Sequence, residues 1–111
     1  METLEQRILK AKTPLQYDKY KEYYIDDKNN DTKYWKRGIH QWVFHFENNY
    51  GASVIKHFGS YGYDEDLFEL AVIKFNNVVW DLCYDTPITS DVIGNLTNDE
   101  ILELLERIKN L

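Results

Sequence analysis

Residues 40–58 decide the fold and read His40-Gln-Trp-Val-Phe-His-Phe-Glu-Asn-Asn-Tyr-Gly-Ala-Ser-Val-Ile-Lys-His-Phe58. Trp42, Phe44 and Phe46 occupy alternate positions, and this period of two is typical of a strand with one buried face. The following Asn48-Asn-Tyr-Gly51 has the composition of a turn, and the next residues are again apolar or β-branched. We therefore expect an antiparallel hairpin, with strands at residues 40–47 and 52–58.

A second hairpin is expected downstream, with strands at residues 67–75 and 78–84 and a two-residue turn at Asn76-Asn77. In this register one face of the hairpin is apolar and carries Ala71, Ile73, Phe75, Val78, Trp80 and Leu82. Leu70 and Val72 lie on the opposite face among charged residues. We expect that second face to be only partly covered.

The C-terminal segment predicts an amphipathic helix. Asp85-Thr-Pro87 is expected to end the sheet, because proline cannot donate to a strand ladder, and a loop or short helical turn is expected over residues 90–94. Thr97 and Glu100 then form a capping box, the signature of a helix start. One face of the expected helix is apolar and carries Ile101, Leu104, Leu105, Ile108 and Leu111, whereas the other carries Glu103, Glu106, Arg107 and Lys109.

The N-terminal segment is expected to be helical. A capping box at Thr3 and Gln6 predicts a first helix. Thr13-Pro14 predicts the start of a second helix, with proline at the first helical position, that reaches about Tyr24 or Ile25.

The whole pattern predicts one α+β domain over residues 1–111: N-terminal helices, a four-stranded antiparallel β-meander and a C-terminal amphipathic helix. The chain has 111 residues, 43% of them hydrophobic and 15% aromatic, which suffices for one core and leaves no room for a second domain.

The sequence excludes a helical membrane span, because no apolar run approaches the length that one requires. The first residues, Met1-Glu-Thr-Leu-Glu-Gln-Arg7, lack the apolar stretch of a secretion signal. A single cysteine, Cys83, cannot form an internal disulfide and fits a reducing compartment. We therefore expect a cytoplasmic location.

Charge is distributed unevenly along the chain, whose net charge is −6. Residues 1–58 contain ten basic and eight acidic residues, whereas residues 59–111 contain three basic and eleven acidic residues, a net charge of −8 for the later half. Such a half repels nucleic acid and attracts a basic protein surface. Net charge also keeps soluble proteins from associating, so solubility alone stays open as an explanation of the acidic residues.

Residues with catalytic or metal-binding chemistry are few. His45 and His57 on neighbouring strands, with His40 and Cys83, invite a zinc interpretation, but no closely spaced ligand pair occurs. We expect these histidines to be ordinary strand residues and Cys83 to be a small buried side chain, and we expect no metal or other cofactor.

Other catalytic interpretations have less support. Ser60, in Gly59-Ser-Tyr-Gly62, lacks the surroundings of a nucleophile, and the same segment lacks the lysine of a phosphate-binding loop. Acid–base catalysis by Asp81, Asp85 or Asp91 would need one carboxyl group with a raised pKa in a cleft. We expect the protein not to be an enzyme.

One basic and aromatic cluster, Lys33-Tyr-Trp-Lys-Arg37, has side chains suited to nucleic-acid contact. It is a single short run in an acidic protein, and its conformation is ambiguous between a short helix and an extended arm. Because tryptophan, tyrosine and arginine are also enriched at protein interfaces, we expect Trp35 to be an interface or core anchor rather than a nucleic-acid contact.

Four segments carry a resemblance: Asn49-Tyr-Gly-Ala-Ser-Val-Ile55, Gly59-Ser-Tyr-Gly62, Leu67-Phe-Glu-Leu-Ala-Val72 and Asp85-Thr-Pro-Ile-Thr-Ser-Asp-Val-Ile-Gly94. The region is similar to small proteins encoded by bacteriophages and prophages. Small acidic phage proteins of this kind include inhibitors of host defence, anti-CRISPR proteins among them. The resemblance implies binding to a basic nucleic-acid-binding surface of a defence enzyme, and it transfers no functional residue.

We therefore expect a phage-derived viral protein, located in the cytoplasm of a bacterial host cell, that evades host defence by inhibiting a nucleic-acid-handling enzyme such as a CRISPR–Cas effector. We expect it to contact neither nucleic acid nor a membrane itself. The expected partner-binding residues are acidic and aromatic: Asp64, Glu65, Asp66, Glu69, Asp85, Asp91, Tyr61, Tyr63 and Trp35. Two alternatives stay open. The first is a structural phage accessory protein that forms a homodimer or larger oligomer through an exposed sheet edge or the aromatic N-terminal segment, and the second is a metal-dependent enzyme that uses His45 and His57.

Overall fold

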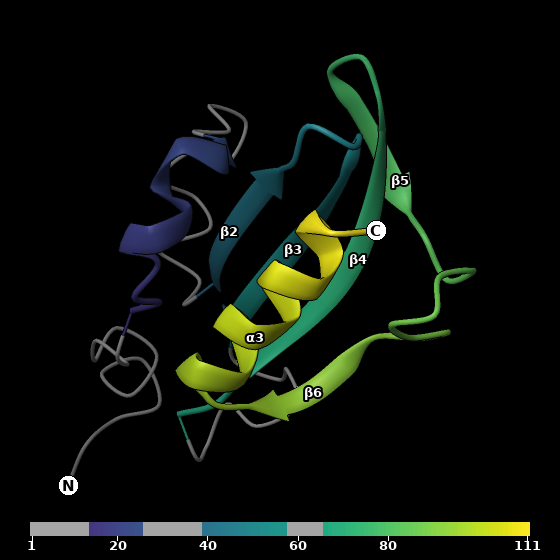
Figure 1. Ribbon diagram of the computed structural model, residues 1–111. Helices are drawn as coiled ribbons and strands as arrows, with labels where there is room; N and C mark the ends of the chain where they lie inside the picture. Colours follow the sequence, from purple (N-terminus) through teal and green to yellow (C-terminus); the bar gives the residue numbers. More distant parts are fainter. Residues whose placement is uncertain (1–13, 26–38, 58–65) are drawn as a thin grey trace, which may run out of the picture.

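The chain forms an antiparallel six-stranded sheet with a C-terminal helix lying across one face, as a computed structural model shows (Figure 1). The structure describes residues 14–25, 39–57 and 66–111. The strand order is β1-β2-β3-β4-β5, and β6 pairs with β4 beside β5. The prediction of an antiparallel sheet followed by a C-terminal helix is confirmed, whereas the predicted number of four strands is too small.

The central hairpin consists of β2 (Ile39–His45) and β3 (Tyr50–His57). Their register pairs Phe44 with Ala52 and Trp42 with Val54, so the alternating aromatic residues share one face. The turn between them is closed by a hydrogen bond of 2.9 Å from the Phe46 N–H to the Tyr50 carbonyl. Asn49 has a φ of 67°, in the left-handed region that asparagine tolerates.

The second hairpin consists of β4 (Phe68–Asn76) and β5 (Val79–Leu82). Phe75 pairs with Trp80 and Ile73 with Leu82, two positions away from the predicted register. The turn is formed by residues 77–78 instead of residues 76–77, with Asn77 at a φ of 61°. Because the register differs from the prediction by an even number of residues, Ile73, Phe75, Trp80 and Leu82 still share one face of the hairpin. Val78, however, lies in the exposed turn.

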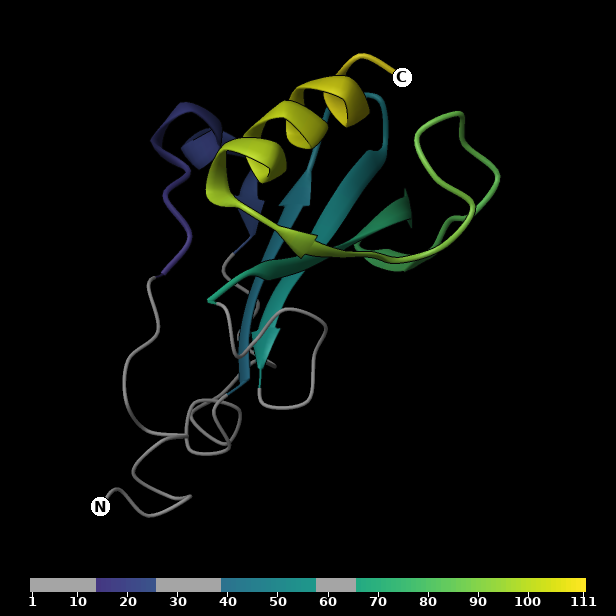
Figure 2. The same cartoon turned by 90° about the horizontal axis from the view of Figure 1, so that it is seen from below.

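Two short strands were not predicted. β1 (Tyr24–Ile25) pairs with β2, and β6 (Ile93–Leu96) pairs with β4 through Phe68–Leu96 and Leu70–Ile93. β6 lies beside the first half of β4 and β5 beside the second half (Figure 2). The expectations that Pro87 ends the sheet and that residues 90–94 form a loop or helical turn are therefore wrong at Ile93–Leu96.

The N-terminal part contains a 3₁₀-helix, η1 (Asp18–Tyr23), instead of the expected α-helix from Thr13-Pro14 to Tyr24 or Ile25. The chain adopts a non-helical φ of −113° at Tyr20 and is already extended at Tyr24. The three-residue spacing of the tyrosines at positions 17, 20 and 23 fits the tighter 3₁₀ turn. The first predicted helix lies outside the described residues.

The C-terminal helix α3 (Asn98–Lys109) begins as predicted. The Thr97 hydroxyl accepts a hydrogen bond from the Glu100 N–H at 3.2 Å, and the Glu100 carboxylate accepts one from the Thr97 N–H at 3.0 Å. The buried face of the helix consists of Ile101, Leu104, Leu105 and Ile108. Leu111, predicted on this face, follows the helix and is 36% exposed.

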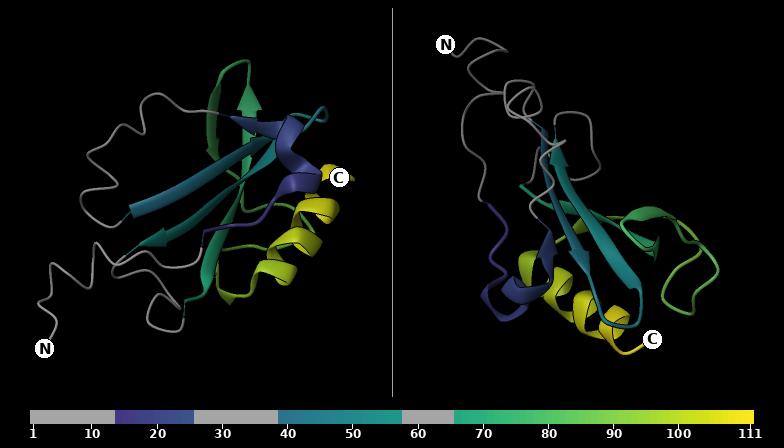
Figure 3. Two further views of the ribbon diagram at one scale, coloured as in Figure 1. Left: turned by 90° about the vertical axis from the view of Figure 1, so that its left-hand side faces the viewer. Right: turned by 90° about the horizontal axis from the view of Figure 1, so that it is seen from above.

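The main core lies between the sheet and the two helical segments, which sit on the same side of the sheet (Figure 3). Leu70 and Val72 are fully buried there, so the face that was expected to be partly covered is the better covered one. The core residues from the sheet and the connecting segments are Leu15, Tyr20, Trp42, Phe44, Phe46, Ala52, Val54, Phe68, Leu70, Val72, Cys83 and Leu96.

The other face of the sheet carries a smaller apolar cluster of Val43, Ile73 and Phe75. The Phe75 ring stacks on His45 at 3.7 Å between centroids and with 5° between planes. The same ring lies over Gly51, where an added Cβ would come within 2.9 Å of the Phe75 Cε2 atom and 1.9 Å of the Phe44 carbonyl oxygen. Gly51 therefore allows the β2–β3 backbones and the Phe75 ring to approach closely.

The substitution Gly51→Ala is expected to lower the free energy of unfolding by about 2 kcal/mol, because the backbone of β2 must move to accept the methyl group. Urea unfolding monitored by tryptophan fluorescence measures this change. A midpoint equal to that of the wild type would contradict the close approach at Gly51.

η1 is connected to α3 by the Tyr20 hydroxyl, which donates a hydrogen bond of 2.7 Å to Glu106 Oε2. Burial and the neighbouring carboxylate raise the pKa of the Tyr20 hydroxyl, and the hydrogen bond lowers the pKa of Glu106. The folded state is therefore stabilised above the ordinary pKa of glutamate, and this contribution is lost as the pH falls through the lowered pKa.

The substitution Tyr20→Phe is expected to lower the free energy of unfolding at neutral pH by about 1 kcal/mol. The difference should shrink in acid, when Glu106 is protonated. Tyr23→Phe in the same 3₁₀-helix is the matched control, since the Tyr23 ring packs on Phe46 at 5.0 Å between centroids and its hydroxyl makes no hydrogen bond with the described residues. Equal effects of the two variants would contradict a specific Tyr20–Glu106 contribution.

Candidate interaction site on the second hairpin

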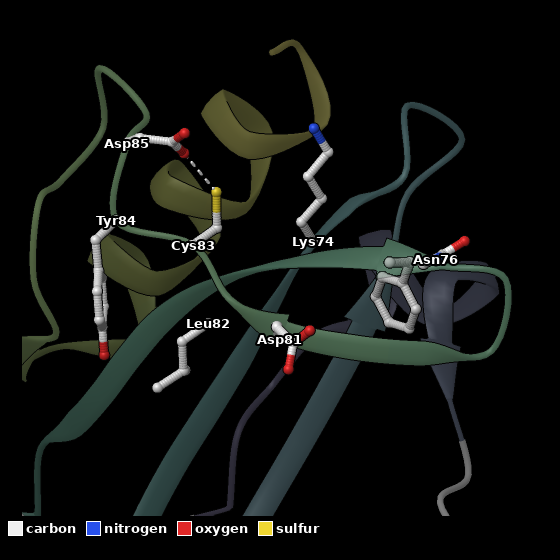
Figure 4. Close-up of a pocket in the computed structure, with 8 residues that line it drawn as sticks. Lys74, Asn76, Asp81, Leu82, Cys83, Tyr84 and Asp85 are labelled. Carbon is white, nitrogen blue, oxygen red and sulfur yellow. Dashed lines mark hydrogen bonds between the residues drawn. The ribbon is translucent and has the colours of Figure 1, made fainter.

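An open groove of about 690 Å³ runs beside the β4–β5 hairpin and the segment that follows it (Figure 4). β4 supplies one wall, and β5 with the first residues after it supplies the other. The lining residues are Lys74, Phe75, Asn76, Asp81, Leu82, Cys83, Tyr84 and Asp85.

Large apolar side chains are exposed around this groove. Val78 is 88% exposed, Val79 64%, Leu82 52% and Tyr84 40%. These are four of the five large apolar side chains that are exposed in the described part of the chain. A group of exposed apolar residues on one hairpin is typical of a protein-binding surface.

The floor of the groove contains a hydrogen-bonded thiol and carboxylate. Cys83 Sγ donates to Asp85 Oδ1 at 2.9 Å (Figure 4). Burial raises the pKa of the Cys83 thiol, and the hydrogen bond from this thiol lowers the pKa of Asp85. The sulfur therefore stays protonated at neutral pH, which disfavours nucleophilic chemistry, and Asp85 stays negatively charged, which disfavours a role as general acid.

The negative charge of Asp81 is not neutralised by the lysine across the hairpin. Asp81 pairs with Lys74 in the strand register, but the Lys74 ammonium lies 5.1 Å from the centroid of the Tyr50 ring and extends away from Asp81 (Figure 4). Among residues 14–25, 39–57 and 66–111, no cation forms an ion pair with Asp81. The groove thus combines two carboxylates, one lysine and exposed apolar surface.

The acidic residues expected to bind a partner are distributed over several places. Asp85 lines the groove, and Asp91 lies in the exposed loop beyond it, where its carboxylate accepts a hydrogen bond of 2.7 Å from the Val92 N–H. Asp66 forms an ion pair of 2.7 Å with Lys56. Glu69 lies in β4 opposite Ile55, on the sheet face that α3 does not cover. The other expected residues, Asp64, Glu65, Tyr61, Tyr63 and Trp35, lie outside the described residues.

Several residues of this hairpin region were not predicted as binding residues, namely Asp81, Leu82 and Tyr84, which line the groove, and Val78 and Val79, which are exposed at the hairpin tip. The two valines were expected within a strand, and Asp81 was considered only as a catalytic acid. The signal that points to them is the run Asn77-Val-Val-Trp-Asp-Leu82, in which two valines follow directly on the turn residue.

The proposed His45 and His57 metal pair is not supported by the hairpin register. His45 pairs with Gly51 and His57 with Ile39, so the two histidines lie at opposite ends of the hairpin, about 20 Å apart at the usual rise per residue. His45 Nε2 lies 3.3 Å from the Asn49 side-chain oxygen. In the described part of the chain, no group of three or more His, Cys, Asp and Glu residues could hold a metal ion.

A second charged cluster lies at the far end of the sheet. Lys56 is only 1% exposed, contacts Asp66, and places its ammonium 3.8 Å from the centroid of the Phe68 ring. Burial, and to a lesser degree the positive charge of Lys56, lower the pKa of His40. This cluster joins the ends of β3 and β4.

Because the pKa of His40 is lowered in the folded state, the unfolded state binds a proton first as the pH falls below about 6.5. We expect the protein to lose stability between about pH 6.5 and the lowered pKa, and we expect His40→Gln to reduce this loss. For each protein, the difference between the urea midpoints at about pH 7.5 and at about pH 5.5 measures how much stability is lost in acid. An equal loss in wild type and in His40→Gln would contradict the assignment to His40.

Comparisons with protein-family models, with curated proteins and with solved structures give no match. None of the helices in the described segments is long and apolar enough to cross a membrane.

Proposed function

We propose that the protein is an interaction protein that binds a cationic surface of another protein through the groove of the β4–β5 hairpin. The observation that carries this proposal is that two exposed apolar side chains, Leu82 and Tyr84, line the groove together with Asp81 and Asp85, while Val78 and Val79 are exposed at the tip of the same hairpin. Apolar burial supplies binding energy, and the carboxylates favour a partner with lysine or arginine at the same place.

The two kinds of side chain act on different stages of binding. The net charge of −8 on residues 59–111 attracts a basic surface over a distance and speeds encounter, an effect that salt weakens. Burial of Val78, Val79, Leu82 and Tyr84 acts only at contact and slows dissociation. Together they fit a protein that occupies a charged site on its partner.

In its specific form, the proposal is that the partner is a host nucleic-acid-handling defence enzyme and that the protein is a phage-derived inhibitor of the anti-CRISPR type. Surfaces that bind nucleic acid are rich in lysine and arginine because they neutralise phosphates. An acidic protein seated on such a surface excludes DNA or RNA by direct competition. The resemblance of about residues 49–111 to phage-encoded proteins and the negative later half of the chain support this form.

The central experiment is a competition assay with purified Cas9-type effector–guide complexes and labelled target DNA. The protein is expected to displace the DNA more strongly at low salt than at high salt. The double substitution Asp81→Lys with Asp85→Lys is expected to weaken this inhibition by about tenfold or more, equivalent to about 1.4 kcal/mol.

The matched control is the double substitution Asp99→Lys with Glu103→Lys on the exposed face of α3, which changes the net charge equally. If the control weakens inhibition as much as the groove variant does, the effect is one of total charge and the groove is not the site. If the wild-type protein displaces no DNA from any effector tested, the inhibitor proposal is wrong.

The expected contribution of Asp64 and Glu65 is tested separately by Asp64→Lys with Glu65→Lys. Asp66 is left unchanged in this variant, because its replacement would break the ion pair with the buried Lys56 and mix a folding defect with a binding defect. Loss of inhibition in this variant alone would place the interface at residues 64–65 rather than on the groove.

A further inference from the structure

β5 is an edge strand of the sheet in the part of the chain that the structure describes. β5 ends the strand order of the sheet and pairs on its inner side with β4 (Figure 1). No strand among residues 14–25, 39–57 and 66–111 pairs with its other side. The segment after Leu82 leaves the sheet and returns only at β6, beside a different part of β4.

One backbone hydrogen bond shows which N–H and C=O groups of β5 point toward β4 and which point away from it. The Cys83 N–H donates to the Val72 carbonyl of β4 at 2.8 Å. Backbone groups alternate in direction along an antiparallel strand, so Val79 and Asp81 also face β4. Trp80 and Leu82 therefore direct their N–H and C=O groups to the open edge.

The side chains along this edge alternate in chemistry. Asp81 stands on the face from which Lys74 extends, while Trp80 and Leu82 lie on the face of Ile73 and Phe75. The edge thus offers, in order, an apolar side chain, a carboxylate and an apolar side chain, with outward backbone groups at the two apolar positions.

We infer that β5 binds an extended segment of the partner protein as an additional strand, with a lysine or arginine opposite Asp81 and apolar side chains beside Trp80 and Leu82. Strand addition uses backbone hydrogen bonds for affinity and alternate side chains for selectivity. This inference rests on the proposed function and names the type of partner segment that the β4–β5 hairpin recognises.

A second copy of the same chain fits the edge poorly. Two copies of β5 that pair antiparallel through the outward groups of both Trp80 and Leu82 would bring the two Asp81 residues directly opposite each other. Like charges at opposed positions destabilise a strand pair, and a charged residue on an edge strand is a common protection against self-association. A basic residue of a different protein removes this repulsion.

The test uses synthetic peptides and the full chain. The probe is a blocked peptide of about eight residues, a usual strand length, with alternating valine and lysine. The comparison peptide has glutamate in place of lysine, and a third peptide carries N-methyl groups that remove backbone donors on one edge. The wild-type chain is expected to bind the valine–lysine peptide about tenfold or more tightly than either of the others.

Two variants test the charge and the backbone independently. Asp81→Lys is expected to reverse the preference toward the valine–glutamate peptide, whereas Asp91→Lys in the loop is the control that should retain the lysine preference. Leu82→Pro removes an outward N–H and is expected to abolish binding, whereas Leu82→Ala keeps this N–H and should lose less. Asp81→Lys decides the question if Leu82→Pro does not fold.

Equal binding of the lysine and glutamate peptides by the wild type, or an unchanged preference in Asp81→Lys, would overturn the inference. A dimer in sedimentation that Asp81→Lys or Leu82→Pro alters would also overturn it, by assigning the edge to a second copy.

The competition assay with effector complexes separates this inference from the proposed function. If the wild type displaces DNA and both β5 variants do so equally well, strand addition is wrong and the inhibitor function stands. If the peptide preferences are found but DNA is never displaced, the inhibitor function is wrong and β5 stands as a strand-binding edge.

Discussion

Burial of β4 is the constraint on which the rest of the structure depends. One side of this strand packs under α3 through Leu70 and Val72, which are fully buried, and the other carries Ile73 and Phe75 in the smaller cluster. Its hydrogen-bonding edges are also occupied, by β3 along one side and by β6 and β5 in succession along the other. A strand enclosed in this way fixes the positions of all its neighbours.

The division of one β4 edge between two strands explains why the candidate site lies on β5. β6 occupies the first half of this edge, so β5 can pair only along the second half and has only four residues. The chain between them must leave the sheet, which opens the groove beside Cys83 and Asp85. The same geometry leaves the far side of β5 without a paired strand in the described part of the chain. Asp81 lies between the two residues whose backbone groups face this side, where its carboxylate opposes self-pairing and favours a cationic strand.

The sequence predicts well what local chemistry determines. Alternation located both hairpins, and the capping box located the start of α3. The sequence could not predict β6, a four-residue strand that contains Gly94 and Asn95. This strand forms because part of one β4 edge is left unoccupied by β5. In the candidate site, Asp85 was predicted from charge alone, whereas exposure of Val78 and Val79 depends on a turn placed one residue later than expected. The pairing of Asp66 with a lysine across the β3–β4 connection likewise requires the fold.

The loop between β5 and β6 has a consequence for engineering. Cys83 is held to Val72 by a backbone hydrogen bond of 2.8 Å, and Ile93 pairs with Leu70, so the loop departs from and returns to nearly adjacent points of one strand. Its length is therefore uncoupled from the sheet, since extra residues add only the slowly growing entropy of closing a longer loop. Ser90, exposed in the later part of the loop, is a suitable point for inserting an affinity tag or a reporter peptide, because an insertion there interrupts the Thr89–Asp91 hydrogen bonds of the loop and leaves the hairpin surface intact.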